Sequence, residues 1–236
     1  MEKPQLAFAL DVSDTEAAVA LAHKISQHVD IFKIGLELFT SEGPAVVSEI
    51  KKTGKKIFLD LKLHDIPATV AGAVSSASKL GVDYLTIHTA GGLEMMKAAA
   101  AAAGNIKILG VTVLTSMDEQ AQAATGVNLS VGETVLKRFD LACTAKIAGI
   151  VASGKELELL SSVDKKSMLY VIPGIRENTA VGDQKRVMDA KTAVSLGADI
   201  LVVGRPIRDA ADPAFAAANF QKKIMEAFSE KKSNAK

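Results

Sequence analysis

The feature that most constrains the fold is a repeat of eight short apolar stretches, rich in β-branched or aromatic residues, each followed by a segment that favours helix. The stretches begin about every 28 residues, close to the ~30 residues of one strand-helix unit in an eightfold barrel. The predicted strands are Leu6–Val12, Ile31–Phe39, Lys56–Leu63, Tyr84–Thr89, Ile106–Leu114, Ala148–Ala152, Leu169–Ile175 and Asp199–Gly204.

Alanine-rich segments between these stretches predict the helices, because alanine has the highest intrinsic helix propensity. The predicted helices are Thr15–His28, Gly43–Thr53, Thr69–Leu80, Leu93–Ala103, Val135–Lys146, Gly154–Leu160, Lys185–Leu196 and Pro213–Phe228. Ser13 and Asp14 are candidate N-caps of the first helix, since their side-chain oxygens can accept free backbone N–H groups. Glycines mark the expected ends of four helices, at Gly54, Gly81, Gly104 and Gly197.

Strands that alternate with helices in this way form a parallel sheet with both faces buried. Eight such strands favour closure into a (β/α)8 TIM barrel of the α/β class, and an open doubly wound sheet is the alternative. No linker rich in proline, glycine or serine divides the chain. Residues 1–228 are therefore predicted to form a single barrel domain, and residues 229–236 a frayed C-terminal tail.

Composition limits the partners and the compartment. Lysine plus arginine total 28 and aspartate plus glutamate 27, so the formal charge of +1 is too small for binding nucleic acid or a membrane surface by bulk charge. No apolar run approaches the ~18 residues of a membrane span, and the first residues lack a signal-peptide pattern. The single cysteine, Cys143, cannot form an intramolecular disulfide and is interpreted as a core residue. We therefore expect a cytoplasmic protein.

Charged residues gather at the C-terminal ends of the predicted strands, where βα barrels build their active sites. Asp11 ends the first strand, Lys33 interrupts the second, and the third carries Asp60 and Lys62, followed by Asp65. Alternation along a strand places Asp60 and Lys62 on the face toward the barrel interior, and the neighbouring leucines on the other. We expect these five charges, which alternate in sign, to meet inside the barrel.

Each of these residues also has a purely structural interpretation. Asp11 can cap a helix, and Lys33 can extend outward to solvent. Asp60 and Lys62 can form a structural ion pair, but desolvation offsets the attraction within a buried pair, so two such pairs in one barrel favour function. His88 follows the fourth strand with inward parity and is interpreted equally well as a structural histidine.

The alternation of signs narrows the chemistry. A divalent-metal site gathers carboxylates without ammonium groups between them, so metal binding is disfavoured. A Schiff-base lysine needs a lowered pKa, whereas lysines flanked by carboxylates stay protonated, which argues against an aldolase. A protonated lysine held between aspartates suits two tasks, stabilising a carbanion and delivering a proton to it.

Two loops that carry glycine and arginine predict an anion site. Pro173–Arg176 (PGIR) follows the seventh strand and Val203–Pro206 (VGRP) follows the eighth, and these two loops commonly hold a phosphate in this fold. Glycine lets the backbone approach the oxygens, and arginine adds charge-assisted hydrogen bonds. The structural alternative is a pair of turns with surface arginines. Two longer polar segments, Thr115–Gly132 and Arg176–Arg186, are candidates for functional loops.

The segment Asp60–Pro67 (DLKLHDIP) resembles the Asp-x-Lys-x-x-Asp-Ile-Pro signature of the orotidine 5′-monophosphate decarboxylase family. The resemblance covers essentially the whole chain. Its supporting motifs are Phe8–Asp11 (FALD), Phe32–Gly35 (FKIG), Leu114–Ser116 (LTS), Pro173–Arg176 (PGIR), Gly182–Gln184 (GDQ) and Val203–Pro206 (VGRP). It implies decarboxylation of orotidine 5′-monophosphate to uridine 5′-monophosphate, in pyrimidine biosynthesis, with neither a metal nor another cofactor.

The resemblance also implies a role for each matching residue. Lys62 would donate a proton to C6 of the pyrimidine, with Asp60 orienting it and Lys33 bridging Asp60 and the ribose. Asp65 and Thr69 would enter the partner's site in a homodimer. The remaining substrate-binding residues would be Asp11 at the ribose, Thr115 and Ser116 at the pyrimidine, and Arg176, Gln184, Gly204 and Arg205 at the phosphate.

Three alternatives stay open at this point. A related sugar-phosphate decarboxylase shares the Asp-x-Lys-x-x-Asp pattern, but uses magnesium and carries glutamate where this chain has Lys33. Ribulose-phosphate epimerase is disfavoured because its histidine and metal pattern is not evident. A phosphate-binding barrel without catalysis would need the two anion loops but not the alternating charges.

Overall fold

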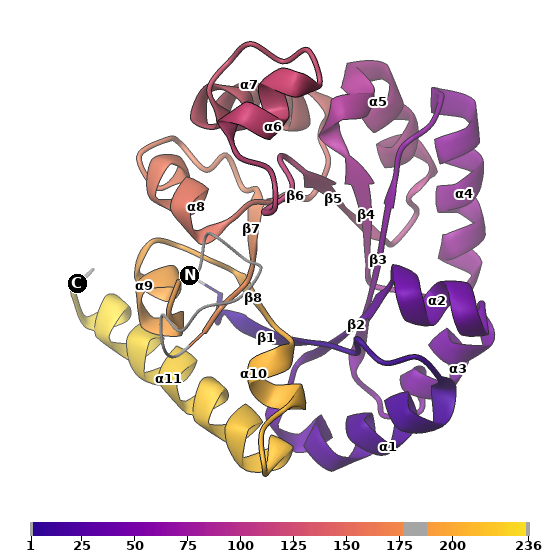
Figure 1. The fold of residues 1–236 in the computed structure, drawn as a ribbon, viewed down its shortest axis with the longest axis vertical. Helices are drawn as coiled ribbons and strands as arrows, with labels where there is room; N and C mark the ends of the chain where they lie inside the picture. The colour runs from indigo at the N-terminus through magenta and orange to yellow at the C-terminus, as the bar shows by residue number, and fades with distance from the viewer. Residues whose placement is uncertain (1, 177–187, 235–236) are drawn as a thin grey trace.

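The computed structural model describes residues 2–176 and 188–234 and arranges eight parallel strands in one closed barrel (Figure 1). Strands that are consecutive in the sequence pair with each other, and β8 closes the barrel against β1. The predicted (β/α)8 barrel is therefore confirmed, and the open doubly wound sheet is excluded. The strands are β1 (Gln5–Ala9), β2 (Ile31–Gly35), β3 (Lys56–Leu63), β4 (Tyr84–His88), β5 (Lys107–Val111), β6 (Gly149–Val151), β7 (Leu169–Pro173) and β8 (Ile200–Val203).

Helices surround the barrel on its outer side (Figure 1). Asp14 caps the first of them, since its Oδ1 accepts the backbone N–H of Ala17 at 2.8 Å. The helices are α1 (Thr15–Ile25), α2 (Leu36–Glu42), α3 (Ala45–Lys51), α4 (Pro67–Lys79), α5 (Gly92–Ala102), α6 (Glu119–Ala124), α7 (Val131–Ala145), α8 (Gly154–Leu160), α9 (Ala190–Ser195), α10 (Arg205–Arg208) and α11 (Pro213–Asn234), with short 3-10 turns η1 (Ser26–His28) and η2 (Thr89–Gly91). Among the described residues, no helix is long and apolar enough to cross a membrane.

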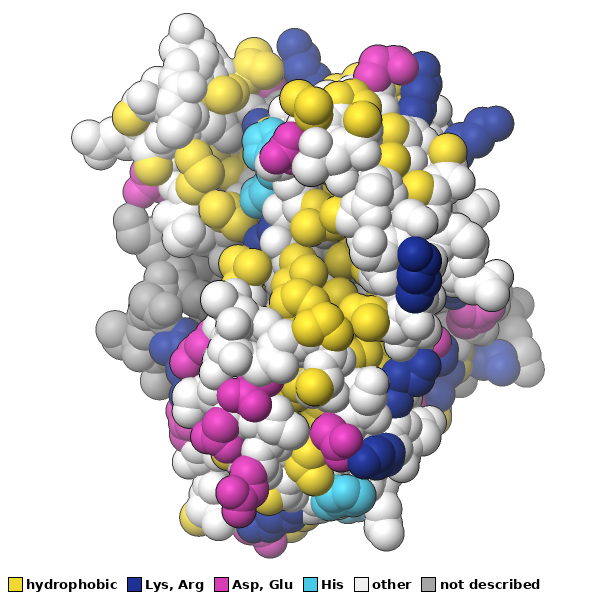
Figure 2. Space-filling view, turned by 90° about the vertical axis from the view of Figure 1, so that its right-hand side faces the viewer, with side chains coloured by type: hydrophobic (Ala, Val, Ile, Leu, Met, Phe, Trp, Pro, Cys, Tyr) yellow, Lys and Arg dark blue, Asp and Glu magenta, His cyan; other side chains and the backbone are white. Residues whose placement is uncertain are grey.

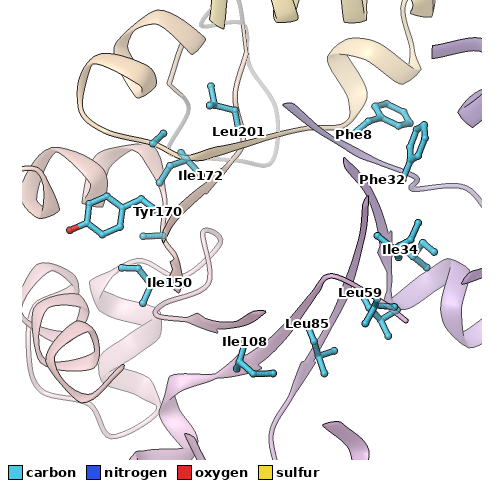
Figure 3. Packing of buried hydrophobic residues seen from close by; sticks show 14 of the residues in the cluster. Phe8, Phe32, Ile34, Leu59, Leu85, Ile108, Ile150, Tyr170, Ile172 and Leu201 are labelled. Atoms are coloured by element: carbon cyan, nitrogen blue, oxygen red, sulfur yellow. The ribbon is translucent and has the colours of Figure 1, made fainter. Parts of the chain in front are cut away.

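Alternation along the strands produces two separate cores. One set of side chains points outward and packs under the helices, as Phe8, Phe32 and Leu59 do in Figure 3. The intervening residues point into the barrel and form a smaller apolar core, which includes Phe58 and Val171. Each fully buried side chain of this size contributes about 1.5–3 kcal/mol to folding, so register is strongly fixed on both faces.

The ends of several strands differ from the prediction. β2 stops at Gly35, and the remainder of the predicted strand Ile31–Phe39 begins α2, because Leu38 reaches the core from a helix. β1 and β5 also end three residues early, at Ala9 and Val111. An apolar run shows that a segment is buried, but it does not mark where the chain leaves the sheet.

The long interval after β5, which the sequence predicts to be a functional loop, contains a short helix. Within the predicted loop Thr115–Gly132, α6 forms six residues of helix, and its N-cap Asp118 accepts the N–H of Ala121 at 2.9 Å. Gln122 in this helix is buried, and its amide nitrogen donates to the carbonyl oxygen of Leu129 at 2.6 Å. The helix residues themselves, EQAQAA, have high helix propensity, so the polar character of the whole interval, and not its local propensity, led to the loop prediction.

The C-terminal helix also extends further than expected. It continues to Asn234, whereas a frayed tail was predicted from residue 229. Lys231 Nζ donates to the carbonyl oxygen of Val194 at 3.0 Å, and Lys191 pairs with Glu230 at 2.9 Å. These contacts with α9 hold the last turns against the barrel. Most of the predicted loop Arg176–Arg186 lies outside the described residues.

Three aspartates stabilise the N-terminal end of the barrel in the same way. Each stands directly before a strand, and its carboxylate accepts a backbone N–H near the start of the preceding strand. Asp30 accepts from Leu6 at 2.9 Å, and Asp83 accepts from Ile57 at 2.8 Å. Asp199 accepts from the N–H of Tyr170. These bonds satisfy strand amides that would otherwise end the sheet unpaired.

Candidate active site

A pocket of about 240 Å³ opens at the C-terminal ends of the strands. Charged residues of the first three strands line one side, and the loops after β7 and β8 line another. Its floor is apolar and consists of inward-facing side chains, namely Ala9, Phe58, Val111, Val151, Val171 and Val202. Because such a floor keeps water away from one side of a ligand, charges above it interact more strongly than in solvent.

Four charged side chains form a continuous network in this pocket. Lys62 Nζ lies 2.9 Å from Asp60 Oδ2, and Lys33 Nζ lies 3.6 Å from the same oxygen. Lys33 Nζ also lies 3.3 Å from Asp11 Oδ1. The order Lys62, Asp60, Lys33, Asp11 alternates in sign across three neighbouring strands. Four of the five charges expected to meet inside the barrel do so, whereas the fifth, Asp65, is exposed and does not line the pocket of its own chain.

Asp60 lies at the centre of this network and is nearly buried. Its side chain is 12% exposed, against 45% for Asp11 at the rim. Burial by itself would raise the pKa of the Asp60 carboxyl. The ammonium groups of Lys33 and Lys62, together with two hydrogen bonds, outweigh that effect and hold this pKa below its usual value. Asp60 is therefore a fixed negative charge at neutral pH.

Lys62 has a backbone conformation that is rare for residues other than glycine. Its φ is +51°, in the left-handed region that costs an L-residue about 1–2 kcal/mol. β3 pairs regularly with β4 up to Leu59, and pairing resumes at Leu63 in a shifted register, so the residues between form a bulge. Asp60 and Lys62 both line the pocket as predicted, but the bulge, rather than plain alternation, aims Lys62. Strain of this kind persists only where the surroundings hold it, and it concentrates at functional sites.

Glycines and arginines form the other end of the pocket. Gly174 has a φ of +77°, a conformation that favours glycine, and it leads to Arg176. A Cβ on Gly204 would lie 3.3 Å from Asp11 Oδ2, so the strand-eight loop passes close to the charged network. Arg205 follows it at the pocket wall. The pocket thus has one end with alternating charges and another suited to an anion.

Most of the predicted substrate-binding residues meet at this pocket, and others do not. Ser116 is exposed and is not among the lining residues, although its neighbour Thr115 is. Gln184 lies outside the described residues. The predicted residues that line the pocket are Asp11, Lys33, Asp60, Lys62, Thr115, Arg176, Gly204 and Arg205.

Asp65 and Thr69 lie outside the pocket of their own chain. Both are exposed, in the turn after β3 and in the first turn of α4. Asp65 Oδ1 accepts the N–H of Ile66 at 2.7 Å, and no salt bridge of Asp65 is found within residues 2–176 and 188–234. These positions neither test nor contradict a role across a subunit interface.

Sequence reasoning missed Thr86. This β4 residue is fully buried, and its hydroxyl contacts both Asp60 and Lys62. Its inward parity was available from the predicted strand Tyr84–Thr89, but a threonine in a strand carries no signal of its own. His88 follows it with the same parity and does not line the pocket, and its ring centroid lies 5.6 Å from that of His64.

Cys143 is partly buried and packs against the main core, in agreement with its interpretation as a core residue. Across the described parts of the chain, no three histidine, cysteine, aspartate or glutamate side chains gather in a group that could hold a metal ion.

Comparison of the sequence with known families gives one match that spans most of the chain. Residues 4–220 match the model described as "Orotidine 5'-phosphate decarboxylase / HUMPS family". A protein of Anaeromyxobacter sp. (strain K) named orotidine 5'-phosphate decarboxylase is 46% identical over 211 residues, which are 89% of this chain and 93% of that protein. A protein of the same name from Methylacidiphilum infernorum is 44% identical over 207 residues, which are 86% of this chain and 90% of that protein.

Solved structures agree with the sequence matches. A crystal structure of orotidine 5'-phosphate decarboxylase from Lactobacillus acidophilus superimposes with a TM-score of 0.83 and 33% identity, covering 94% of this chain and 99% of that one. A structure of the decarboxylase from Methanocaldococcus jannaschii, complexed with the inhibitor BMP, has a TM-score of 0.78 and 26% identity, covering 94% and 99%. The chain therefore belongs to the orotidine 5'-phosphate decarboxylase / HUMPS family and is an enzyme, a carboxy-lyase.

Proposed function

We propose that this chain converts orotidine 5′-monophosphate to uridine 5′-monophosphate without a metal or another cofactor, and that Lys62 donates the proton to C6. The observation that carries the proposal is the Lys62 ammonium group, 2.9 Å from an ionised Asp60 carboxylate above an apolar pocket floor. The names of the relatives support the choice of substrate.

The two ends of the pocket suit the two ends of this substrate. The phosphate binds at Gly204, Arg205 and Arg176, where arginines supply charge-assisted hydrogen bonds. We assign Gln184, which lies outside the described residues, to the phosphate on the family resemblance alone. The ribose hydroxyls bind Asp11 and Lys33, which have both donor and acceptor groups. The remaining polar residues, Thr115 and Ser116, bind the pyrimidine.

The reaction requires electrostatic stabilisation above all. The bond between C6 and the carboxylate breaks, CO2 leaves, and the electron pair remains on C6 as a carbanion. No neighbouring group delocalises this pair, so a cation close to C6 must stabilise it. The Lys62 ammonium supplies this charge and then transfers a proton from Nζ to C6. The neutral amine regains its proton from solvent.

Lys33 supports the metal-free form of the reaction. Its ammonium group lies within 3.6 Å of carboxylate oxygens of both Asp11 and Asp60. A divalent cation bound by these carboxylates would stand beside this positive charge and be repelled by it. The same ammonium group neutralises part of the negative charge at Asp60, which keeps the network compatible with an anionic substrate.

We further propose a homodimer in which Asp65 and Thr69 enter the partner's pocket. The segment around them is unusually apolar for a surface, because Ile66 is 66% exposed and Leu36 at the start of α2 is 53% exposed. Figure 2 shows the side of the molecule that carries α4, where hydrophobic side chains gather in a band. Exposed apolar patches mark interaction sites. A cytoplasmic location also stays part of the proposal, since the only cysteine cannot form a disulfide within the chain.

Turnover of orotidine 5′-monophosphate tests the function directly. We expect stoichiometric uridine 5′-monophosphate and CO2, with activity unchanged after extensive dialysis against EDTA. Loss of activity on chelation, with recovery on adding magnesium, would contradict the metal-free reaction. Binding of the nucleotide without any turnover would instead indicate a phosphate-binding barrel that is not an enzyme.

Complementation between inactive variants tests the shared site. Lys62→Ala and Asp65→Ala chains are each expected to be inactive alone, but a mixed dimer has one pocket with both native residues. Mixing them with verified subunit exchange should therefore restore activity, up to about a quarter of the wild-type value if exchange is random. Mixing two Lys62→Ala preparations is the control. No recovery after exchange would show that Asp65 acts within its own chain.

A further inference from the structure

Thr86 connects the two central charged residues from the neighbouring strand. Its side chain is 0% exposed, and its Oγ1 lies 2.8 Å from Asp60 Oδ1 and 2.9 Å from the backbone nitrogen of Lys62. An ionised carboxylate only accepts hydrogen bonds, and an amide N–H only donates them. The hydroxyl therefore donates to Asp60 and accepts from Lys62, so that one side chain holds both residues.

The pairing register between β3 and β4 explains why a side-chain hydroxyl, and not a backbone carbonyl, accepts the N–H of Lys62. Leu59 pairs with Leu85 and Leu63 pairs with Ile87, so three residues of β3 stand opposite Thr86 alone. In this bulge the backbone N–H of Lys62 donates to the hydroxyl of Thr86. A regular ladder would use a backbone carbonyl as the acceptor. The bond lies at the residue with the left-handed φ, and it stabilises a conformation that local sterics disfavour.

The two oxygens of Asp60 have different partners because of this contact. Oδ1 accepts from Thr86, which leaves Oδ2 directed at the ammonium groups of Lys62 and Lys33, at 2.9 Å and 3.6 Å. Rotation of the carboxylate would break the Thr86 bond. The hydroxyl thus fixes both the direction of the negative charge and the backbone from which Lys62 extends.

We infer that Thr86 is a positioning residue of the active site, whose hydroxyl holds the Asp60 carboxylate and the Lys62 backbone so that the Lys62 ammonium group meets the reacting carbon. Thr86 does not line the pocket, so it acts through Asp60 and Lys62 rather than on the substrate. The inference rests on the proposed decarboxylation. A displacement of a catalytic group by about 1 Å is enough to cost on the order of 100-fold in rate.

The test compares two variants of Thr86 with a matched control. Thr86→Val keeps the shape of the side chain and removes both hydrogen bonds, whereas Thr86→Ser keeps the hydroxyl. Thr112→Val is the control, because Thr112 is also 0% exposed and its hydroxyl donates to the carbonyl oxygen of Val151 at 3.0 Å, away from the charged network. For each chain we would measure kcat, KM, the affinity for uridine 5′-monophosphate and the thermal midpoint.

We expect kcat of Thr86→Val to fall at least tenfold below that of Thr112→Val, with nucleotide affinity within about threefold of wild type, because the phosphate end is untouched. Thr86→Ser should keep kcat within about threefold of wild type. Equal kcat for Thr86→Val and Thr112→Val would overturn the inference, as would equal losses in the valine and serine variants.

Two further arms keep the outcome decisive. If Thr86→Val does not fold, Thr86→Cys preserves the volume with a weaker donor, and its kcat should fall between those of wild type and an inactive chain. Wild-type kcat in Thr86→Cys would then overturn the inference. An inactive wild-type chain would instead refute the proposed decarboxylation, which separates the two failures.

Discussion

Aspartate side chains have different roles at the two ends of the barrel. At the N-terminal end, each of the carboxylates of Asp30, Asp83 and Asp199 accepts a strand N–H group, and Asp30 and Asp199 also pair with surface lysines. At the C-terminal end, Asp60 and Asp11 are held mainly by ammonium groups that face the pocket. The first arrangement stabilises the sheet, and the second leaves charge available to a ligand.

This difference explains where strain is tolerated. The N-terminal end continues a regular ladder, and each aspartate adds a bond that the sheet would otherwise lack. The C-terminal end contains the bulge and the left-handed Lys62, whose cost the remainder of the barrel offsets. A closed barrel with a well-packed interior can therefore hold a destabilised active site at one end.

The largest expected effect comes from removing Lys62 at the C-terminal end of β3, and Lys56 at the other end of the strand is the control. Lys62→Ala removes the proton donor and the cation at C6 together, so kcat should fall on the order of 10⁴-fold or more while the fold is retained. Lys56→Ala, at the other end of the same strand, removes an exposed side chain 3.3 Å from Gln5 Oε1 and should change kcat less than twofold. Steady-state kinetics and circular dichroism measure both. Near-normal turnover by folded Lys62→Ala would remove the functional contrast between the ends.

A smaller effect is expected at the anion end of the pocket. Arg205→Ala should lower kcat/KM for orotidine 5′-monophosphate on the order of 100-fold or more, because a charge-assisted contact with the phosphate is lost. The nucleoside orotidine, which has no phosphate, should be turned over slowly and at nearly the same rate by wild type and variant. Comparing the two substrates isolates the phosphate contact. Equal losses for both would mean that Arg205 shapes the pyrimidine end or the barrel itself.

The N-terminal end should respond in stability and not in activity. Asp83→Ala leaves the N–H of Ile57 without its acceptor, so the free energy of unfolding should fall by about 1–3 kcal/mol. Because this site lies at the opposite end of the barrel, kcat measured below the unfolding transition should stay unchanged. Urea unfolding followed by fluorescence or circular dichroism gives the first value. A fall in kcat without a fall in stability would show that the two ends are coupled.

The smallest effect concerns the pH dependence of stability near the charged network. Burial lowers the pKa of His88, and the nearby charges of His64, Lys62 and Arg138 lower it further, against an opposing effect of Asp60. The folded protein thus binds the proton less readily than the unfolded chain. The resulting stability is present above the unfolded pKa of about 6.5 and is lost as the pH falls below it.

Replacing this imidazole should flatten that pH dependence. In His88→Gln, the thermal midpoint should fall less between pH 7 and pH 5 than in wild type. His23→Gln is the control at the other end of the barrel, because His23 is exposed in α1. If the thermal midpoint depends on pH equally in wild type and in His88→Gln, His88 does not cause the pH dependence of stability at the C-terminal end of the barrel.

The site could be predicted in part because two kinds of signal survive in the sequence. Strand parity identifies Asp60 as an inward residue, and the order of strands brings Asp11 and Lys33 beside it. Thr86 has no such signal, since its role depends on a two-residue shift in pairing between β3 and β4. The sequence pattern likewise does not reveal that Ser116 is exposed while Thr115 lines the pocket.

The sequence by itself determines the number of strands, their alternation with helices and the inward face of Asp60, because these follow from local periodicity and turn residues. Only the tertiary structure decides where β2 gives way to α2, how Lys62 turns within the bulge, and which hydroxyl holds the Asp60 carboxylate. Those features depend on contacts between segments far apart in the chain. Their energies exceed the local preferences that a sequence pattern records.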